Sequence, residues 1–349
     1  MDLKIELTIN INDAQQQTIK IHIDLEKNEA RCVSDYSKGT TATTISTCAQ
    51  TQSFQDFMIL LVKEKLQNGR LRTAETYQTT LNKFNRFLKG KTLLFHDFND
   101  SLMVNYQEYL KSNKVCMNTI SFYMKILKAT YLRAVRQKLT IDNRPFDHVY
   151  TGMAKTQKRA LSQQDIRMIK DYTPENKQEQ LARDLFLFSF YTRGMAFVDM
   201  AYLKKSDIKN NILYYSRKKS GQNISIRWEP VMQQIVDNFE KLNETYLLPI
   251  IHTEGKGERN QYRYVHNIVN KNLVSIGVRL GIRQKLTMYV ARHSWASIAK
   301  SIGIPIGVIS EALGHSSEKM TYIYLKSIDE TRIDAENEKI INLLNDKKN

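Results

Sequence analysis

Cysteine is scarce in this sequence of 349 residues, and a signal for export or membrane insertion is missing. The three cysteines, Cys32, Cys48 and Cys116, are too few and too scattered for a disulfide framework or a zinc site. No run of about 18 apolar residues occurs, which excludes a membrane-spanning helix. The N-terminus lacks a basic start followed by an apolar stretch, so we expect no secretory signal. These absences predict a soluble cytoplasmic protein with reduced thiols.

Proline is also rare, with only 5 residues, and charged residues make up 25% of the chain. Both values argue against a disordered chain, and a hydrophobic content of 42% is sufficient for ordinary cores. The length favours two domains, or three. We therefore expect a folded protein of several domains.

Acidic residues are outnumbered, since 36 Asp and Glu face 52 Lys and Arg, for a formal charge of +16. Residues 1–49 carry a net −2, residues 50–150 carry +8 and residues 151–349 carry +10. The excess is therefore spread over two large segments and is not a tail. A polyanion that touches both segments would explain it, although a merely basic surface is the alternative.

The first 52 residues differ in character from the rest. Residues 3–10 and 18–25 alternate apolar and polar side chains, which predicts two strands with a turn at Asn12-Asp13. Residues 33–52 are rich in Ser and Thr without periodicity, and we interpret them as a linker.

Residues 53–140 have the apolar spacing of four helices. The polar side of the fourth predicted helix carries four basic residues, Lys125, Lys128, Arg133 and Arg136. These residues either contact DNA or form a solvated face. A basic segment, residues 142–160, follows and resembles an interdomain linker with Lys155, Lys158 and Arg159.

The rest of the chain is predicted to be mostly helical with one sheet-like interruption. Residues 181–203 are apolar on all sides around LFLFSFY, which predicts a single central helix. Residues 212–228 predict two strands joined by a turn at Ser220-Gly221. Further helices are expected from Ser162, Thr287, Pro305 and Ser317, and a charged one over residues 329–345.

Three short motifs in the last third are informative only together. They are Ala291-Arg292-His293-Ser294, Leu313-Gly314-His315-Ser316-Ser317 and Thr321-Tyr322-Ile323-Tyr324, which places Tyr324 nine residues after His315. Taken singly, each has an ordinary structural explanation as a solvated arginine, a helix cap or a core tyrosine. Their order and spacing resemble the arginine, histidine and nucleophile motifs of the tyrosine recombinase (phage integrase) family. The Arg217-Lys218-Lys219-Ser220-Gly221 turn resembles the lysine-bearing β-hairpin of that family.

The resemblance implies a mainly α fold with a small β-sheet. It covers residues 50–349 and implies a helical core DNA-binding domain at 50–145, a basic linker at 146–160 and a catalytic domain at 161–349. Residues 1–49 would form a strand-containing extension that contacts accessory DNA or another protein.

The resemblance also implies a chemical role for each matching residue. Tyr324 would attack a DNA phosphodiester, Arg292 would hold the phosphate, and His315 would assist proton transfer. Lys219, with Lys218 as the alternative, would protonate the leaving 5′ oxygen. Arg217 and Lys218 would contact DNA, as would the basic residues of the helical domain and the linker. No metal or other cofactor is implied, and the sequence shows neither a Gly-rich phosphate loop nor an acidic metal cluster.

Two positions depart from the family pattern. Tyr289 stands three residues before Arg292, where the family usually has histidine. Ala196 stands three residues before Asp199, where the family's first arginine is expected. Arg193 lies one helical turn earlier, and we expect it to share a helix face with position 196. We therefore predict Arg193 and Tyr289 as site residues, Asp199 as an orienting residue and His293 as a packing partner of Arg292.

The resemblance predicts a bacterial site-specific recombinase, associated with the nucleoid, that integrates or excises a mobile element or inverts DNA. Its partners would be double-stranded DNA with specific sites and an accessory DNA-bending or directionality protein. The protein would form a homotetramer on DNA, in which the subunits exchange the predicted helix over residues 329–345. Because Ala196 and Tyr289 depart from the pattern, a catalytically impaired DNA-binding protein of the same fold is the alternative. A type IB topoisomerase shares the chemistry, and generic RNA binding is more distant.

Overall fold

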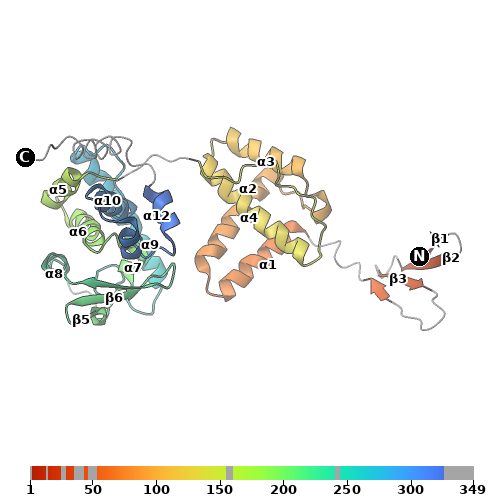
Figure 1. Cartoon of the computed structure of the whole chain (residues 1–349), viewed down its shortest axis with the longest axis horizontal. Coiled ribbons are helices and arrows are strands. Elements are labelled where there is room, and N and C mark those ends of the chain that lie inside the picture. The colour runs from red at the N-terminus through yellow and green to blue at the C-terminus, as the bar shows by residue number, and fades with distance from the viewer. Residues whose placement is uncertain are drawn as a thin grey trace, which may run out of the picture. The chain divides into compact units, whose positions relative to one another are not determined.

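The computed structural model describes residues 53–154, 160–239 and 244–325, the backbone of four N-terminal strands, and no side chains for residues 323 and 324. The chain divides into two compact units, Met1–Thr156 and Gln157–Asn349 (Figure 1). The finer boundaries expected at 49, 145 and 160 stay predictions. In the described part of the chain, no helix has the length and apolar character needed to cross a membrane.

The N-terminal strands form one antiparallel sheet in the order β1-β2-β3-β4. These strands are β1 (Asp2–Asn12), β2 (Gln15–Asp24), β3 (Glu29–Ser34) and β4 (Thr43–Ile45). The first two were expected. Strand β3 lies partly and β4 wholly within the predicted linker, whose Val and Thr residues favour extended backbone over the irregular structure that its composition suggested.

The helical part of the first unit contains the four predicted helices. They are α1 (Phe54–Gln67), α2 (Leu71–Leu88), α3 (Asp100–Ser112) and α4 (Met117–Arg136), with a short 3₁₀ turn, η2 (Phe95–Asp97). Helix α4 packs against the other three. Aromatic rings fill the core, where the Phe98 centroid lies 4.6 Å from that of Phe54 and 5.1 Å from that of Tyr131.

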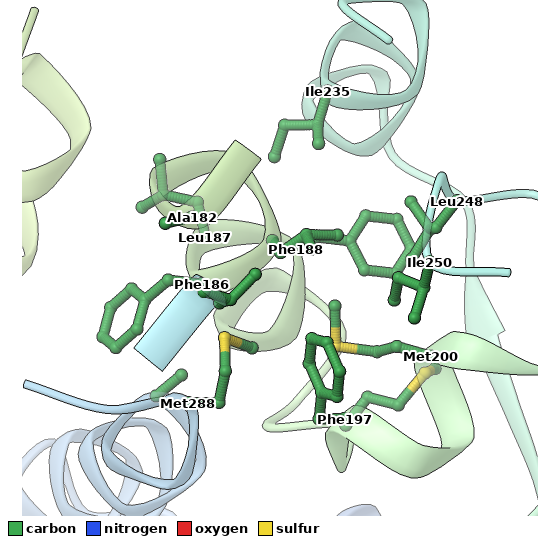
Figure 2. Packing of buried hydrophobic residues seen from close by; sticks show 14 of the residues in the cluster. Ala182, Phe186, Leu187, Phe188, Phe197, Met200, Ile235, Leu248, Ile250 and Met288 are labelled. Carbon is green, nitrogen blue, oxygen red and sulfur yellow. The ribbon is translucent and has the colours of Figure 1, made fainter. Parts of the chain in front are cut away.

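The second unit surrounds one buried helix, α6 (Lys177–Tyr191). Its other elements are α5 (Gln163–Asp171), α7 (Phe197–Ala201), η3 (Lys205–Asp207), β5 (Ile208–Lys209), β6 (Ile212–Ser216), β7 (Asn223–Arg227), α8 (Pro230–Asp237), α9 (Glu258–Arg279), α10 (Met288–Ser301), α11 (Ile306–Ala312) and α12 (Glu318–Leu325). Figure 2 shows Phe186 and Phe188 projecting from different sides of α6, with Phe188 directed toward Leu248 and Ile250. The helix is central because it is apolar on all sides, as its sequence indicated.

The prediction of one helix over residues 181–203 was wrong. Helix α6 ends at Tyr191, and Arg193 and Gly194 follow with φ angles of 60° and 73°. Two successive residues with positive φ cannot continue a right-handed helix. Ala196 then caps α7, so positions 193 and 196 do not share a helix face.

The small sheet is antiparallel in the order β5-β6-β7. Strands β6 and β7 form the predicted hairpin, with Leu213 opposite Ile226 and Ser216 opposite Asn223. The buried side chains of β7 alternate with exposed ones, so one face of the hairpin packs on the core. This packing fixes the position of the loop between the two strands. The mainly α fold with a small β-sheet is confirmed.

Candidate active site

A cavity of about 760 Å³ lies in the second unit, where several of the predicted site residues converge. Its polar lining consists of Arg217, Lys219, Ser220, Tyr262, His266, Tyr289, Arg292, His315 and Ser316. These side chains come from α9, α10, the β6–β7 loop and the segment between α11 and α12. Segments far apart in the sequence therefore form one polar site.

Arg292 lies on α10 and is only 7% exposed. Its guanidinium donates from Nη1 to the carbonyl oxygen of Gly194, at 2.8 Å, and from Nη2 to that of Leu313, at 2.5 Å. Gly194 has no room for a side chain, because a Cβ atom there would lie 2.7 Å from the Cα of Arg292. The turn that ends α6 therefore supports Arg292 directly.

His315 follows a tight turn at the end of α11. Gly314 has a φ of +61°, and the His315 amide donates to the carbonyl of Ser310. The ring Nδ1 lies 2.8 Å from the Oγ1 of Thr321 on α12. Burial, together with the charges of Arg292, Arg217 and Lys219, lowers the pKa of His315 to about 4. The imidazole is therefore neutral at physiological pH.

The β6–β7 loop separates its two lysines. Lys219 lines the cavity, whereas the ammonium of Lys218 lies 4.1 Å from the centre of the Tyr202 ring. The Lys218 amide donates to the buried carboxylate of Asp199 at 2.9 Å. Burial raises the pKa of Asp199, while this amide and the charge of Arg217 act in the opposite direction. Asp199 thus holds the loop, and the loop presents Lys219 to the cavity.

Arg217, the first residue of that loop, is buried and lines the cavity. Its Nη1 donates to the carbonyl oxygens of Leu313 and Gly314, and its Nε lies 3.8 Å from a carboxylate oxygen of Asp199. The resemblance implied that Arg217 contacts DNA, and this stays a prediction. Its side chain forms part of the cavity wall.

Arg193 is not among the residues that line the cavity. Its Nη1 donates to the carbonyl oxygen of Ser225 on β7, at 3.4 Å. We expected Arg193 to reach the site because it would lie on the same helix face as Ala196. Helix α6 ends at Tyr191, so the two residues do not share a helix face. Ala196 itself does line the cavity, without a polar side chain.

Tyr289 and His293 occupy successive turns of α10. Their rings are stacked, with centroids 6.3 Å apart and an angle of 16° between the planes. Tyr289 is 60% exposed and lines the cavity, whereas His293 is buried. The placement of His293 within the helix packing agrees with a structural role, and Tyr289 lies at the cavity wall.

Tyr324 is part of α12, which spans Glu318–Leu325, but its side chain lies outside the described residues. Thr321, one turn earlier on the same helix, is fully buried and contacts His315. The helix that carries the predicted nucleophile is therefore connected to the cavity through this contact.

Tyr262 and His266 were not predicted as site residues, and they line the cavity from α9. Their rings stack with centroids 5.9 Å apart, and burial lowers the pKa of His266. The Nε2 of His266 lies 3.0 Å from the Nδ2 of Asn270. Their spacing of four residues was the available signal, because i and i+4 lie on one face of a helix.

The basic residues predicted for DNA contact differ in their environment. Arg133 forms a bidentate ion pair with Glu64 of α1, at 3.1 and 2.6 Å, so it joins two helices of its unit. Lys125 and Arg136 are exposed, and Lys128 is half-buried. The interdomain residues Lys155, Lys158 and Arg159, as well as the 329–345 helix, lie outside the described residues.

Comparisons with known proteins agree with this geometry. A family model described as "Phage integrase SAM-like domain" matches residues 53–151, and one described as "Phage integrase family" matches residues 159–331. The chain belongs to the tyrosine recombinase family. It is accordingly a tyrosine-type site-specific recombinase.

Relatives of this recombinase include the tyrosine recombinases XerD of Rickettsia bellii and XerC of Staphylococcus aureus. The first is 24% identical over 71% of this chain and 86% of its own length, and the second 21% identical over 72% and 85%. A lambda integrase, solved as a dimer bound to a COC′ core site, has a TM-score of 0.59 at 13% identity and covers 87% of this chain and 93% of its own. The Tn1549 transposon integrase in complex with circular intermediate DNA has a TM-score of 0.64 at 14% identity and covers 83% of this chain and 100% of its own. These two structures have the same fold as the recombinase.

Proposed function

We propose that this recombinase cleaves and rejoins double-stranded DNA at specific sites through a 3′-phosphotyrosine intermediate on Tyr324. The observation that carries the proposal is the single cavity lined by Arg292, Lys219 and His315, with α12 connected to it through Thr321. Three groups that bind phosphate or move protons thus meet beside the helix that carries a tyrosine.

In the cleavage step, the Oη of Tyr324 attacks the phosphorus, and the bond from phosphorus to the 5′ oxygen breaks. The negative charge that develops on the nonbridging oxygens is held by Arg292, whose planar guanidinium suits bidentate contact. The product is a phosphodiester between the 3′ end of the DNA and the tyrosine. Because this linkage preserves a phosphodiester, a free 5′ hydroxyl can reverse the reaction without ATP.

Two protons move in this step. An unperturbed phenol has a pKa of about 10, so Tyr324 has to lose its proton during attack. We assign His315 as the acceptor, since the tautomer that donates from Nδ1 to Thr321 leaves Nε2 as a base. Lys219 gives a proton to the departing 5′ oxygen. We assign Tyr289, which lines the cavity, to donate a hydrogen bond to the phosphate.

Binding of DNA would combine contacts to the phosphates with a few contacts to bases. The excess positive charge on both large segments and the exposed side chains of Lys125 and Arg136 support this proposal. We also propose a homotetramer on DNA, formed through the 329–345 helix. A lambda integrase structure has the form of a tetramer bound to a Holliday junction. Integration or excision of a mobile element, or inversion, would be the outcome.

The decisive experiment traps the covalent intermediate. A suicide duplex, nicked near the crossover point and containing a recombination site mapped in the DNA that flanks the gene, should form a covalent adduct with the wild-type protein. Tyr324→Phe should form none. Tyr322→Phe is the matched control, because Tyr322 lies on the same helix and is 52% exposed, and it should form the adduct at the wild-type rate.

Two alternatives make different predictions in simple assays. A catalytically impaired DNA-binding protein would bind the duplex and give no adduct with wild-type protein, but the intact set of Arg292, Lys219 and His315 argues against it. A type IB topoisomerase would relax supercoiled plasmid that lacks any target site. Relaxation that depends on a specific recombination site would instead support recombination.

A further inference from the structure

In the proposed reaction, one position that is expected to carry a phosphate-binding arginine has no charged side chain. Ala196, at the place where the resemblance expects the first arginine, contributes no charge to the cavity, and Arg193 bonds to β7. Within the described residues, the arginines that line the cavity are Arg217 and Arg292.

We propose that Arg217 is a catalytic residue that binds the nonbridging oxygens of the scissile phosphate together with Arg292. Arg217 comes from the β6–β7 hairpin and not from the turn after α6, so the charge missing at Ala196 is supplied from another element. This inference rests on the proposed function, because it assigns a residue to the same reaction.

The two guanidinium groups are anchored to a common acceptor. Arg217 donates from Nη1 to the carbonyl oxygen of Leu313 at 2.9 Å, and Arg292 donates from Nη2 to the same oxygen at 2.5 Å. Two donors on one oxygen have to lie side by side. Leu313 is also two residues before His315, so the shared acceptor lies next to the site's histidine.

Arg217 has N–H donors that are not used in hydrogen bonds within the described part of the protein. A guanidinium carries five N–H donors, and the hydrogen bonds of this one within the described part of the protein all come from Nη1. Its Nε is buried without a hydrogen-bond partner, and its carboxylate neighbour Asp199 lies 3.8 Å away. The side chain is nevertheless only 8% exposed. A buried arginine with unused donors at the wall of a cavity is suited to bind an oxyanion.

The charged side chains that line the cavity are all basic, which also favours a bound anion. Arg217, Arg292 and Lys219 line the cavity, and no acidic side chain is among the lining residues. Asp199 lies behind the wall, where it accepts the Lys218 amide and offsets one of the three positive charges. Burial lowers the pKa of His315, and the positive charges of Arg292, Arg217 and Lys219 lower it further. An anion such as a phosphodiester would neutralise these charges.

Gly314 provides the space through which Arg217 reaches the cavity. A Cβ atom at Gly314 would lie 2.6 Å from the Cδ of Arg217 and 2.8 Å from the Cδ1 of Ile224. The glycine of the Leu-Gly-His motif therefore allows the hairpin arginine to pass beneath the turn. Its carbonyl also accepts a hydrogen bond from Arg217.

The test compares two scissile phosphates in the suicide duplex. On the ordinary phosphodiester, Arg217→Ala should lower the rate of adduct formation by about 10²-fold or more. On a duplex with a neutral methylphosphonate at the scissile position, the variant and the wild type should react within about tenfold of each other, since no charged nonbridging oxygen pair remains to be neutralised. A role limited to folding would give the same defect on both substrates.

Matched controls separate the possible failures. Arg227→Ala removes an arginine of the same hairpin that is 83% exposed, and it should cleave like the wild type. Arg217→Lys keeps the charge and should retain more activity on the phosphodiester than Arg217→Ala. Equal rates for wild type and Arg217→Ala on the phosphodiester, or an unchanged defect on the methylphosphonate, would overturn the inference. Absence of adduct with the wild type would instead contradict the proposed function.

Discussion

The Nδ1 atom of His315 lies 2.8 Å from the Oγ1 atom of Thr321, a fully buried residue of α12. Thr321 precedes Tyr324 by about one helical turn. The hydrogen bond therefore ties the ring of His315 to the helix that carries the predicted nucleophile. It also determines which ring nitrogen is directed to other partners.

Thr321→Val should lower the rate of adduct formation by about fivefold, because one hydrogen bond of about 1 kcal/mol that orients the imidazole is lost while the shape is kept. Thr321→Ser retains the hydroxyl and should cleave close to the wild-type rate. Single-turnover cleavage of a suicide duplex provides the measurement. A valine variant as fast as the serine variant would show that the contact does not orient His315.

The depressed pKa of His315, about 4, predicts how stability depends on pH. In the unfolded chain the imidazole takes up a proton as the pH falls through about 6.5, whereas in the folded protein it stays neutral down to about 4. The unfolded state therefore binds more protons in this window, and this residue makes the protein less stable as the pH falls from 7 to 5.

Urea unfolding of the wild type and His315→Gln at pH 7 and pH 5 tests this prediction. The wild type should lose more unfolding free energy between the two pH values than the glutamine variant, which cannot titrate. Parallel losses in both proteins would contradict the lowered pKa. The ring resonances of His315 should likewise show no titration near pH 6.5.

Lys219→Ala should slow cleavage by about 10²-fold to 10⁴-fold, the usual contribution of a general acid. Replacement of the 5′ bridging oxygen by sulfur should restore most of the rate, since a thiolate leaves without a proton. Lys218→Ala is the matched control, because Lys218 lies over the Tyr202 ring and should matter little on either substrate. A defect in Lys219→Ala that sulfur does not relieve would exclude proton donation to the leaving group.

Gly194→Ala should destabilise the fold and displace Arg292. The residue has a φ of +73°, and an added Cβ would lie 2.7 Å from the Cα of Arg292. Gly281→Ala separates the backbone strain of a positive φ from the steric clash with Arg292. Gly281 has a φ of +65°, and no atom lies within 4 Å of the added Cβ. We expect about 1 kcal/mol from the backbone alone at Gly281, and a larger loss at Gly194. Equal losses in urea unfolding would mean that the turn can move away from Arg292.

Lys125→Ala and Arg133→Ala should differ although both residues lie on α4. Lys125 is exposed, so its loss should weaken DNA binding and reduce the dependence of log affinity on log salt by about one. Arg133 is paired with Glu64 and, together with Lys65, lowers the pKa of Glu64 to about 2, so the loss of Arg133 should affect stability more than binding. Titration of labelled duplex at several salt concentrations, with urea unfolding of each variant, distinguishes the two outcomes.

The sequence by itself determined many of the elements and the order of the motifs along the chain. Periodic apolar residues gave α1 to α4, and the Ser220-Gly221 turn gave the hairpin, because local spacing decides which face of an element is buried. Arg292 and His315 could be assigned from short motifs, since each lies in a local structure that its neighbours define. In the tertiary structure both residues line one cavity.

Only the tertiary structure decided which further charges enter that cavity. The break after Tyr191 directs Arg193 to β7, while a path beneath Gly314 brings Arg217 next to Arg292. Tyr262 and His266 line the cavity from α9. Arg133, which lies on α4, forms an ion pair with Glu64. Sequence periodicity shows which side of an element is buried. It does not show which distant element lies opposite, because that depends on how the buried faces of the whole unit pack together.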